Sequence, residues 1–159
     1  MAQIILDHTT LKKTIDELKQ EGKTIVFTNG CFDILHVGHI RCLKGARELG
    51  DILIVALNSD ASTRMLKGEG RPIFPEEERL EIIATLEMVD FVTLFDTETV
   101  APLLSLLKPH IHAKGTDYTE ETVPEREVVE NYGGRIAIVG DSKTHASSLL
   151  IKAIKGNDA

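Results

Sequence analysis

Hydrophobic positions along this chain follow two alternating patterns. Short, nearly continuous apolar runs that are rich in β-branched residues alternate with longer stretches in which apolar residues recur every three or four positions. The short runs predict five strands, over residues 24–29, 52–57, 91–95, 111–114 and 135–139. Because polar residues do not interrupt these runs at every second position, they indicate parallel strands that helices cover on both faces.

The stretches between the strands have the periodicity of amphipathic helices. They predict helices over residues 9–21, 38–49, 75–86, 102–107, 122–132 and 147–154. Regular alternation of strand and helix predicts an α/β fold, with a Rossmann-like, doubly wound, five-stranded parallel sheet in a three-layer α/β/α arrangement. We expect a single domain over residues 23–159, with residues 1–22 as an N-terminal helical extension.

Composition and charge narrow the class of protein. With 159 residues, of which 42% are hydrophobic, the chain can form one domain with a substantial core. The formal net charge of −7 argues against a general nucleic-acid-binding protein. No apolar run reaches the ~18 residues that a membrane span requires. We therefore expect neither nucleic acid nor a membrane as a partner.

The N-terminus and the cysteines indicate a cytoplasmic protein. The first eight residues contain no basic segment and reach Asp7 after three apolar residues, so they do not predict a secretory signal. Cys31 and Cys42 have no CxxC spacing and no second cluster, so they suggest neither a zinc site nor a disulfide framework.

The segment after the first strand, Asn-Gly-Cys-Phe-Asp-Ile-Leu-His-Val-Gly-His at residues 29–39, carries the clearest chemical signal. Doubly wound sheets bind ligands beyond the carboxyl ends of their strands, and helix N-termini there favour phosphate. His36 and His39 lie three residues apart, which places both rings on one face of the first helical turn. The segment therefore predicts a phosphate-binding site, whereas the absence of a GxGxxG fingerprint argues against an NAD enzyme.

The pattern Gly-x-Phe-Asp-x-x-His-x-Gly-His at residues 30–39 resembles the signature of the cytidylyltransferase-like nucleotidyltransferases. Further matches to that family are Lys67-Gly68, Arg71-Pro72 with Arg79, residues 114–118 and Gly133-Gly134. The resemblance covers roughly residues 23–154. Within the family, residues 28–36, 58–62 and 66–68 are most similar to the branch that adenylylates heptose 1-phosphate in ADP-heptose synthesis.

The resemblance implies a role for each matching residue. It implies catalysis by His36, His39 and Lys67, with Lys67 bridging the two reacting phosphates. It implies nucleotide binding by Gly30, Cys31, Phe32, Val37, Gly38, Arg79, Asp117, Ser147 and Ser148. It implies binding of the acceptor substrate by Asp33, Asp60 and Arg71, although we expect Asp33 mainly to hold the loop, since it lies just before the helix start. Arg79 is expected to reach the departing pyrophosphate, and Asp117 to lie beside the base or the ribose.

The implied partners are ATP, a sugar phosphate and a second copy of the chain in a homodimer. Mg²⁺ is expected to arrive with the nucleoside triphosphate, without a metal site of the protein's own. Two alternatives stay open, a cytidylyltransferase acting on glycerol 3-phosphate or another alcohol phosphate, and a non-catalytic nucleotide-binding regulator. The sequence also departs from the family at the start of the last helix. His145 and Ala146 replace an apolar residue and the first serine of a Ser-Thr-Thr element, which leaves the local phosphate contacts open.

Overall fold

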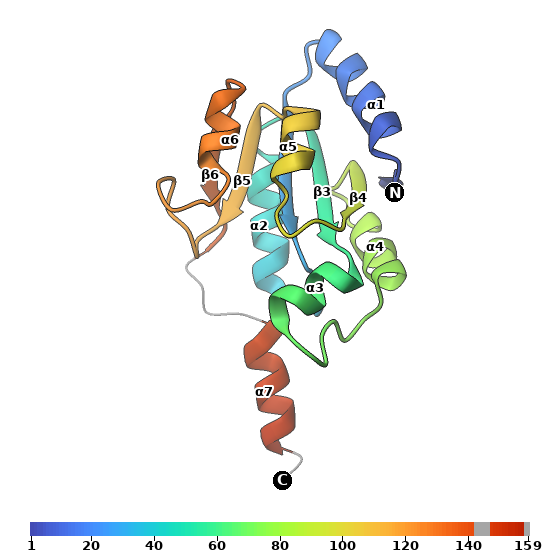
Figure 1. Ribbon diagram of the computed structural model, residues 1–159, viewed down its shortest axis with the longest axis vertical. Coiled ribbons are helices and arrows are strands. Elements are labelled where there is room, and N and C mark those ends of the chain that lie inside the picture. The colour runs from blue at the N-terminus through green and yellow to red at the C-terminus, as the bar shows by residue number, and fades with distance from the viewer. Residues whose placement is uncertain (142–146, 158–159) are drawn as a thin grey trace.

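A computed structural model describes residues 1–141 and 147–157 (Figure 1). In this part of the chain, six strands form one parallel sheet in the order β1-β4-β3-β2-β5-β6. The strands are β1 (Gln3–Ile4), β2 (Ile25–Gly30), β3 (Ile52–Asn58), β4 (Phe91–Phe95), β5 (Ile111–Gly115) and β6 (Arg135–Val139). The prediction of a parallel α/β sheet is confirmed, and β2 to β6 match the five predicted strands to within one residue at each end.

The sixth strand, β1, forms one edge of the sheet and pairs with β4 through only two residues. The N–H groups of Gln3 and Ile5 donate to the carbonyls of Asp90 and Val92, and Nε2 of His8 lies 2.7 Å from the carbonyl oxygen of Leu94. A strand this short has no periodicity that sequence analysis could detect. The N-terminal segment thus contributes a strand as well as the predicted helix.

Seven helices surround the sheet in the described part of the chain. They are α1 (His8–Gln20), α2 (Val37–Arg47), α3 (Asp60–Lys67), α4 (Glu76–Ala84), α5 (Ala101–Leu107), α6 (Arg126–Asn131) and α7 (Ser147–Asn157). Sequence analysis missed α3 because its apolar side chains Met65 and Leu66 are exposed, so no buried stripe marks it. It begins at Ser59, whose hydroxyl accepts from the N–H of Ser62.

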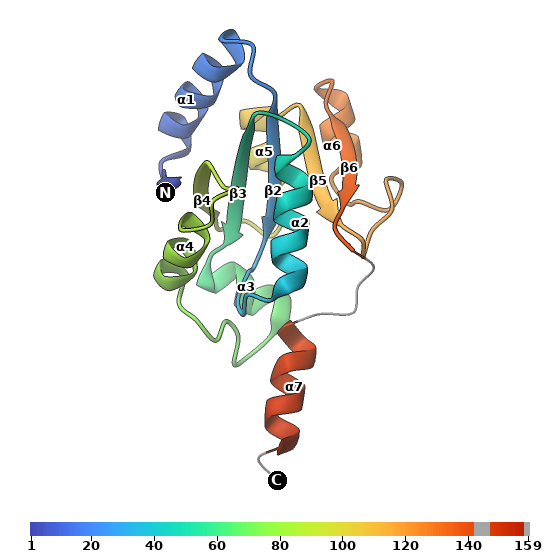
Figure 2. The same cartoon turned by 180° about the vertical axis from the view of Figure 1, so that it is seen from behind.

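The helices form the two outer layers of the predicted three-layer arrangement (Figures 1 and 2). Helices α1, α5 and α6 pack on one face, against strand residues such as Phe27 and Ile54. Helices α2 and α4 pack on the other face, against Val26 and Val55. Leu11 and Ile15 of α1 are fully buried, so the first helix forms part of the core. Helix α7 projects away from the sheet in Figure 1.

The order of the strands positions the site. Strand β2 leads into α2 on one face, and its neighbour β5 leads into α6 on the opposite face. Because the chain departs in opposite directions from these adjacent strands, a crevice opens beyond their carboxyl ends, where ligands of such sheets bind. Among the helices of the described residues, none has the length and apolar character needed to cross a membrane.

Candidate active site

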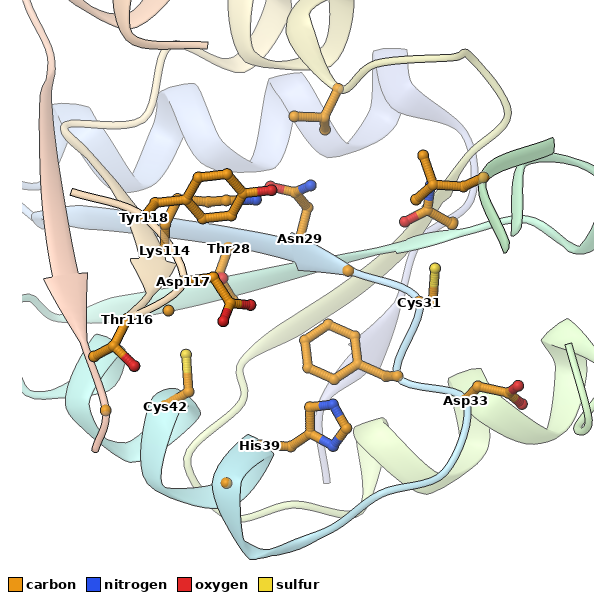
Figure 3. A pocket seen from close by; sticks show the side chains of 18 of the residues that line it. Thr28, Asn29, Cys31, Asp33, His39, Cys42, Lys114, Thr116, Asp117 and Tyr118 are labelled. Atoms are coloured by element: carbon orange, nitrogen blue, oxygen red, sulfur yellow. The ribbon is translucent and has the colours of Figure 1, made fainter. Parts of the chain in front are cut away.

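A cavity of about 500 Å³ lies at this crevice (Figure 3). Its volume falls within the range of small-molecule sites. The cavity brings together most of the residues implicated by sequence, namely Gly30, Cys31, Phe32, Asp33, His36, Gly38, His39, Lys67, Arg71, Asp117 and Ser148. Three others, Val37, Asp60 and Arg79, do not line it. The side chain of Ser147 and the residues 142–146, including His145, lie outside the described part of the structure.

The two histidines are fixed at the start of α2 by backbone N–H groups. His36 is the N-cap of the helix, and its Nδ1 accepts from the N–H of Gly38 at 3.1 Å. Nδ1 of His39 accepts from the N–H of His36 at 3.2 Å, and the two rings stack 3.9 Å apart. Because Nδ1 is the acceptor in each ring, the neutral imidazole carries its proton on Nε2. Each ring is therefore set to donate a hydrogen bond through Nε2.

Asp33 holds the loop that follows α3. Its buried carboxylate accepts from the N–H groups of Ile73 and Phe74 and from Nε of Arg71, at 2.7–2.9 Å. Burial alone would raise the pKa of this carboxyl, but the two backbone donors and the Arg71 guanidinium outweigh it and keep the pKa below its usual value. With its oxygens engaged in this way, Asp33 orients Arg71, whose side chain also lines the cavity.

Arg79 does not reach the cavity, which corrects the role expected for it. Its side chain is fully buried, and its guanidinium donates to the carbonyls of Cys31, Asn58 and Phe74 and to the Asp60 carboxylate, at 2.7–3.0 Å. Arg79 therefore joins the loops after β2 and β3 to the start of α4. The same ion pair corrects the role of Asp60, whose carboxylate serves Arg79 and lies outside the cavity.

Val37 and Lys67 differ in how they relate to the cavity. The Val37 side chain is 42% exposed and lies outside the lining, so only its backbone at the first turn of α2 could serve a nucleotide. Lys67 is the last residue of α3, is exposed and lines the cavity.

Both cysteines are free thiols that line the same cavity, and burial raises the pKa of the Cys42 thiol.

Several lining residues were given no role by sequence analysis. Thr28, Asn29, Asn58, Lys114 and Tyr118 lie within the segments that resemble the family, whereas Glu98, Thr99 and Glu125 lie outside them. A general signal was nevertheless present, because most of them follow directly on the carboxyl ends of predicted strands or come from the loops beyond them. Among the described residues, no group of three or more His, Cys, Asp or Glu side chains is arranged to hold a metal ion.

Asn29 is oriented by a buried histidine of the neighbouring strand. Nε2 of His112 lies 2.9 Å from Oδ1 of Asn29, and because an amide oxygen only accepts, Nε2 carries the proton. Burial lowers the pKa of His112 to about 3, so the ring is neutral at physiological pH. Its Nδ1 is buried without a hydrogen-bond partner among the residues that the structure describes.

Comparison with known proteins identifies relatives over nearly the whole chain. A family model described as Cytidylyltransferase-like matches residues 27–157. The bifunctional protein HldE of Pelobacter propionicus is 53% identical over 150 residues, which is 94% of this chain and 31% of HldE. HldE of Syntrophotalea carbinolica is 50% identical over 145 residues, covering 91% of this chain and 30% of its own length. The chain thus spans about 30% of the length of these curated relatives.

Solved structures agree on the fold. The lipopolysaccharide core biosynthesis protein from Thermoplasma volcanium superposes with a TM-score of 0.65 at 33% identity, covering 77% of this chain and 100% of its own. Pantoate-beta-alanine ligase from Francisella tularensis also reaches a TM-score of 0.65, covering 100% of this chain and 79% of its own. At 16% identity, the second likeness concerns the fold alone.

Proposed function

The chain belongs to the cytidylyltransferase-like family of nucleotidyltransferases, and from this premise we propose that it transfers AMP from ATP to D-glycero-β-D-manno-heptose 1-phosphate. The products are ADP-heptose and pyrophosphate, for lipopolysaccharide core or a related glycan. The observation that carries the proposal is the pair of Nε2 donors of His36 and His39, which line a cavity together with Lys67. The identity of about 50% to HldE proteins supports the choice of acceptor, as does the likeness to a lipopolysaccharide core biosynthesis protein.

In this reaction a phosphate oxygen of the acceptor attacks the α-phosphorus of ATP. The new bond joins that oxygen to the α-phosphorus, and the bond from the α-phosphorus to the oxygen that bridges to the β-phosphorus breaks, so pyrophosphate leaves with the electron pair. The attacking phosphate is already an anion, so the reaction needs little help from a general base. Catalysis then consists of positioning the two phosphates and stabilising the charge that develops between them.

We assign the positioning of the phosphates and the stabilisation of charge to residues at the N-terminus of α2 and at the C-terminal end of α3. Nε2 of His36 and of His39 donate to the triphosphate, and the N–H groups of the first turn of α2 add their dipoles. The ammonium group of Lys67 bridges the acceptor phosphate and the α-phosphate as they approach. Arg71, held by Asp33, supplies a further positive charge at the cavity. Arg79 takes no direct part, because it is buried beneath these loops.

Mg²⁺ enters this scheme as part of the substrate, bound to the triphosphate oxygens, where it neutralises charge. Because the proposed substrate is ATP, we also expect the enzyme to be cytoplasmic. We further expect it to be a homodimer, which light scattering of the purified chain tests.

The decisive experiment is a pyrophosphate-release assay that crosses ATP, CTP and GTP with heptose 1-phosphate and glycerol 3-phosphate. We expect ATP with heptose 1-phosphate to give the highest kcat/KM. Preferred turnover of CTP with glycerol 3-phosphate would replace this proposal with an alcohol-phosphate cytidylyltransferase. Nucleotide binding without any release of pyrophosphate would indicate a regulator.

A further inference from the structure

The part of the cavity formed by the end of β5 and the loop before α6 carries two charged side chains that the scheme above leaves unused. Lys114 lies near the end of β5, and Glu125 directly precedes α6. Tyr118 comes from the loop between them, with its ring centroid 5.0 Å from Nζ of Lys114. All three line the cavity, and we refer to them as the β5–α6 wall. Figure 3 shows Lys114 and Tyr118 gathered at one end of the site, with His39 and Asp33 toward the other.

Glu125 is unusual for its position. It is the N-cap residue of α6, yet its side chain makes no capping bond, and it is only 8% exposed. Its Oε2 is buried and has no hydrogen-bond partner among the residues that the structure describes. A buried carboxylate oxygen without a donor destabilises the folded protein, and Ser, Thr, Asp or Asn would cap the helix better. The side chain is therefore better explained by a donor that a ligand brings into the cavity.

Lys114 complements Glu125 chemically. Its ammonium group interacts electrostatically with Glu125 and Asp117, and burial lowers its pKa. Since Oε2 of Glu125 has no hydrogen-bond partner among the described residues, this attraction does not satisfy that oxygen. An ammonium group donates hydrogen bonds and a carboxylate accepts them, whereas a hydroxyl group does both. Neighbouring hydroxyl groups on one ligand could thus engage both side chains at once.

The charges near the wall favour hydroxyl groups over phosphate. Glu125 and Asp117 bring two carboxylates against the single ammonium of Lys114, so this end of the cavity repels an additional anion. In the proposed scheme the phosphates lie with His36, His39, Lys67 and Arg71, which line the same cavity. The ligand group at the β5–α6 wall is therefore uncharged and rich in hydroxyl groups.

The fold assigns this group to the acceptor. A triphosphate at the N-terminus of α2 lies on the side of the cavity that this helix forms, and α2 packs on one face of the sheet. Glu125 comes from the start of α6, which covers the opposite face. We propose that Lys114 and Glu125 bind the sugar hydroxyl groups of the acceptor, and that they select a polyhydroxylated sugar phosphate over a smaller alcohol phosphate. This inference rests on the proposed function.

The test uses Lys114→Met and Glu125→Gln, with Lys44→Met and Glu127→Gln as matched controls at exposed positions of α2 and α6. Pyrophosphate release gives KM for heptose 1-phosphate. The same assay gives KM for glycerol 3-phosphate or, where it is not turned over, its inhibition constant. Calorimetry gives the dissociation constant of ATP. We expect each test variant to raise KM for heptose 1-phosphate about tenfold or more, since each removes a hydrogen bond to a charged group.

We expect the ATP dissociation constant, the glycerol 3-phosphate constant and both control variants to change by less than about twofold. A structural role for the pair predicts something different, namely a lower unfolding temperature with no selective change in KM. Because Oε2 of Glu125 accepts no hydrogen bond from the part of the chain that the structure describes, Glu125→Gln should not lower the unfolding temperature. Lys114→Arg, which keeps the charge, should recover part of the loss.

Three outcomes overturn the inference. These are an unchanged KM for the sugar phosphate, an equal rise for both acceptors, or an equal loss of ATP affinity, which would assign the wall to the nucleotide. The wild-type acceptor preference is a separate result. If a different sugar phosphate is preferred, the proposed acceptor is wrong, and the ratio between that sugar phosphate and glycerol 3-phosphate still decides the role of the wall. A wild-type preference for glycerol 3-phosphate overturns both.

Discussion

The start of α2 and the β5–α6 wall face the same cavity, but their polar side chains differ in how far the protein itself satisfies them. At α2, the Nδ1 atoms of His36 and His39 accept backbone N–H groups, and the Asp33 carboxylate accepts three donors. At the opposite wall, Glu125 keeps a buried oxygen without a partner among the described residues. Nearby, Nδ1 of His112 lacks a partner within the same part of the chain.

This difference separates two ways of building a site. Side chains that the backbone already holds are preorganised, so they can stabilise charge without first changing conformation. Side chains that lack partners destabilise the free protein and gain most when a ligand arrives. We therefore expect substitutions near α2 to affect folding and rate, and substitutions at the β5–α6 wall to affect acceptor affinity. The predictions below test this contrast, beginning with the largest expected effect.

Arg79→Met should destabilise the fold by about 3–5 kcal/mol, because it leaves the Asp60 carboxylate and three backbone carbonyls without their buried donor. Urea denaturation followed by circular dichroism measures the free energy of unfolding. Arg64→Met, at an exposed position of α3, is the control. Normal stability combined with weak pyrophosphate binding would restore a direct role for Arg79 in phosphate binding.

His36→Ala and His39→Ala should each lower kcat by roughly 10²–10³, the usual cost of losing one donor to developing charge. His36→Asn sharpens the comparison, because asparagine can still cap α2 but does not place a donor where Nε2 lies. We expect it to keep the stability of the wild type and lose its turnover, measured by denaturation and pyrophosphate release. Wild-type turnover in both alanine variants would show that the site is wrongly assigned.

Lys67→Ala should lower kcat by about 10- to 100-fold, the range for a hydrogen bond to a charged group. If Lys67 bridges two phosphates that approach in the transition state, ATP binding measured by calorimetry should weaken much less. Lys67→Arg should restore activity only in part, because a planar guanidinium does not replace a compact ammonium group. Arg64→Ala, three residues earlier on α3, controls for loss of charge on the helix. Equal losses in binding and turnover would limit Lys67 to holding the nucleotide.

Because His112 is buried in its neutral form, the free energy of unfolding should fall in mild acid. Its pKa is about 3 in the folded protein against an ordinary 6.5, so the unfolded chain binds a proton that the folded chain rejects. Stability from this group is therefore complete above pH 6.5 and falls as the pH drops toward 3, by about 2 kcal/mol at pH 5. His112→Gln, which keeps a donor for Asn29, should reduce the slope of unfolding free energy against pH by about one proton. Equal slopes in the two proteins would contradict this account.

Much of this architecture could be predicted from the sequence. Strands β2 to β6 were predictable because buried parallel strands are continuous apolar runs, and the loop before α2 because its glycines and histidines have few other uses at a strand end. Helix α3 and strand β1 were not, since an exposed helix and a two-residue strand have no periodic apolar pattern.

The errors at the site have a common physical cause. An arginine near a phosphate motif has the same sequence context whether it faces phosphates or, like Arg79, backbone carbonyls, because tertiary contacts decide which. Lys114 lies within a segment that resembles the family and Glu125 lies outside any such segment, and the two approach one another only when β5 and α6 are assembled. A motif therefore marks residues near the site without showing which of them act together.

The edge of the sheet at β4 has a consequence for the behaviour of the protein at high concentration. Three outward carbonyls of this edge, those of Asp90, Val92 and Leu94, face Gln3, Ile5 and His8 of the N-terminal segment. An edge strand with open carbonyls is a template on which a second molecule can add its own strand and begin an aggregate. By covering this template from within the same chain, the first eight residues protect the enzyme against edge-to-edge aggregation.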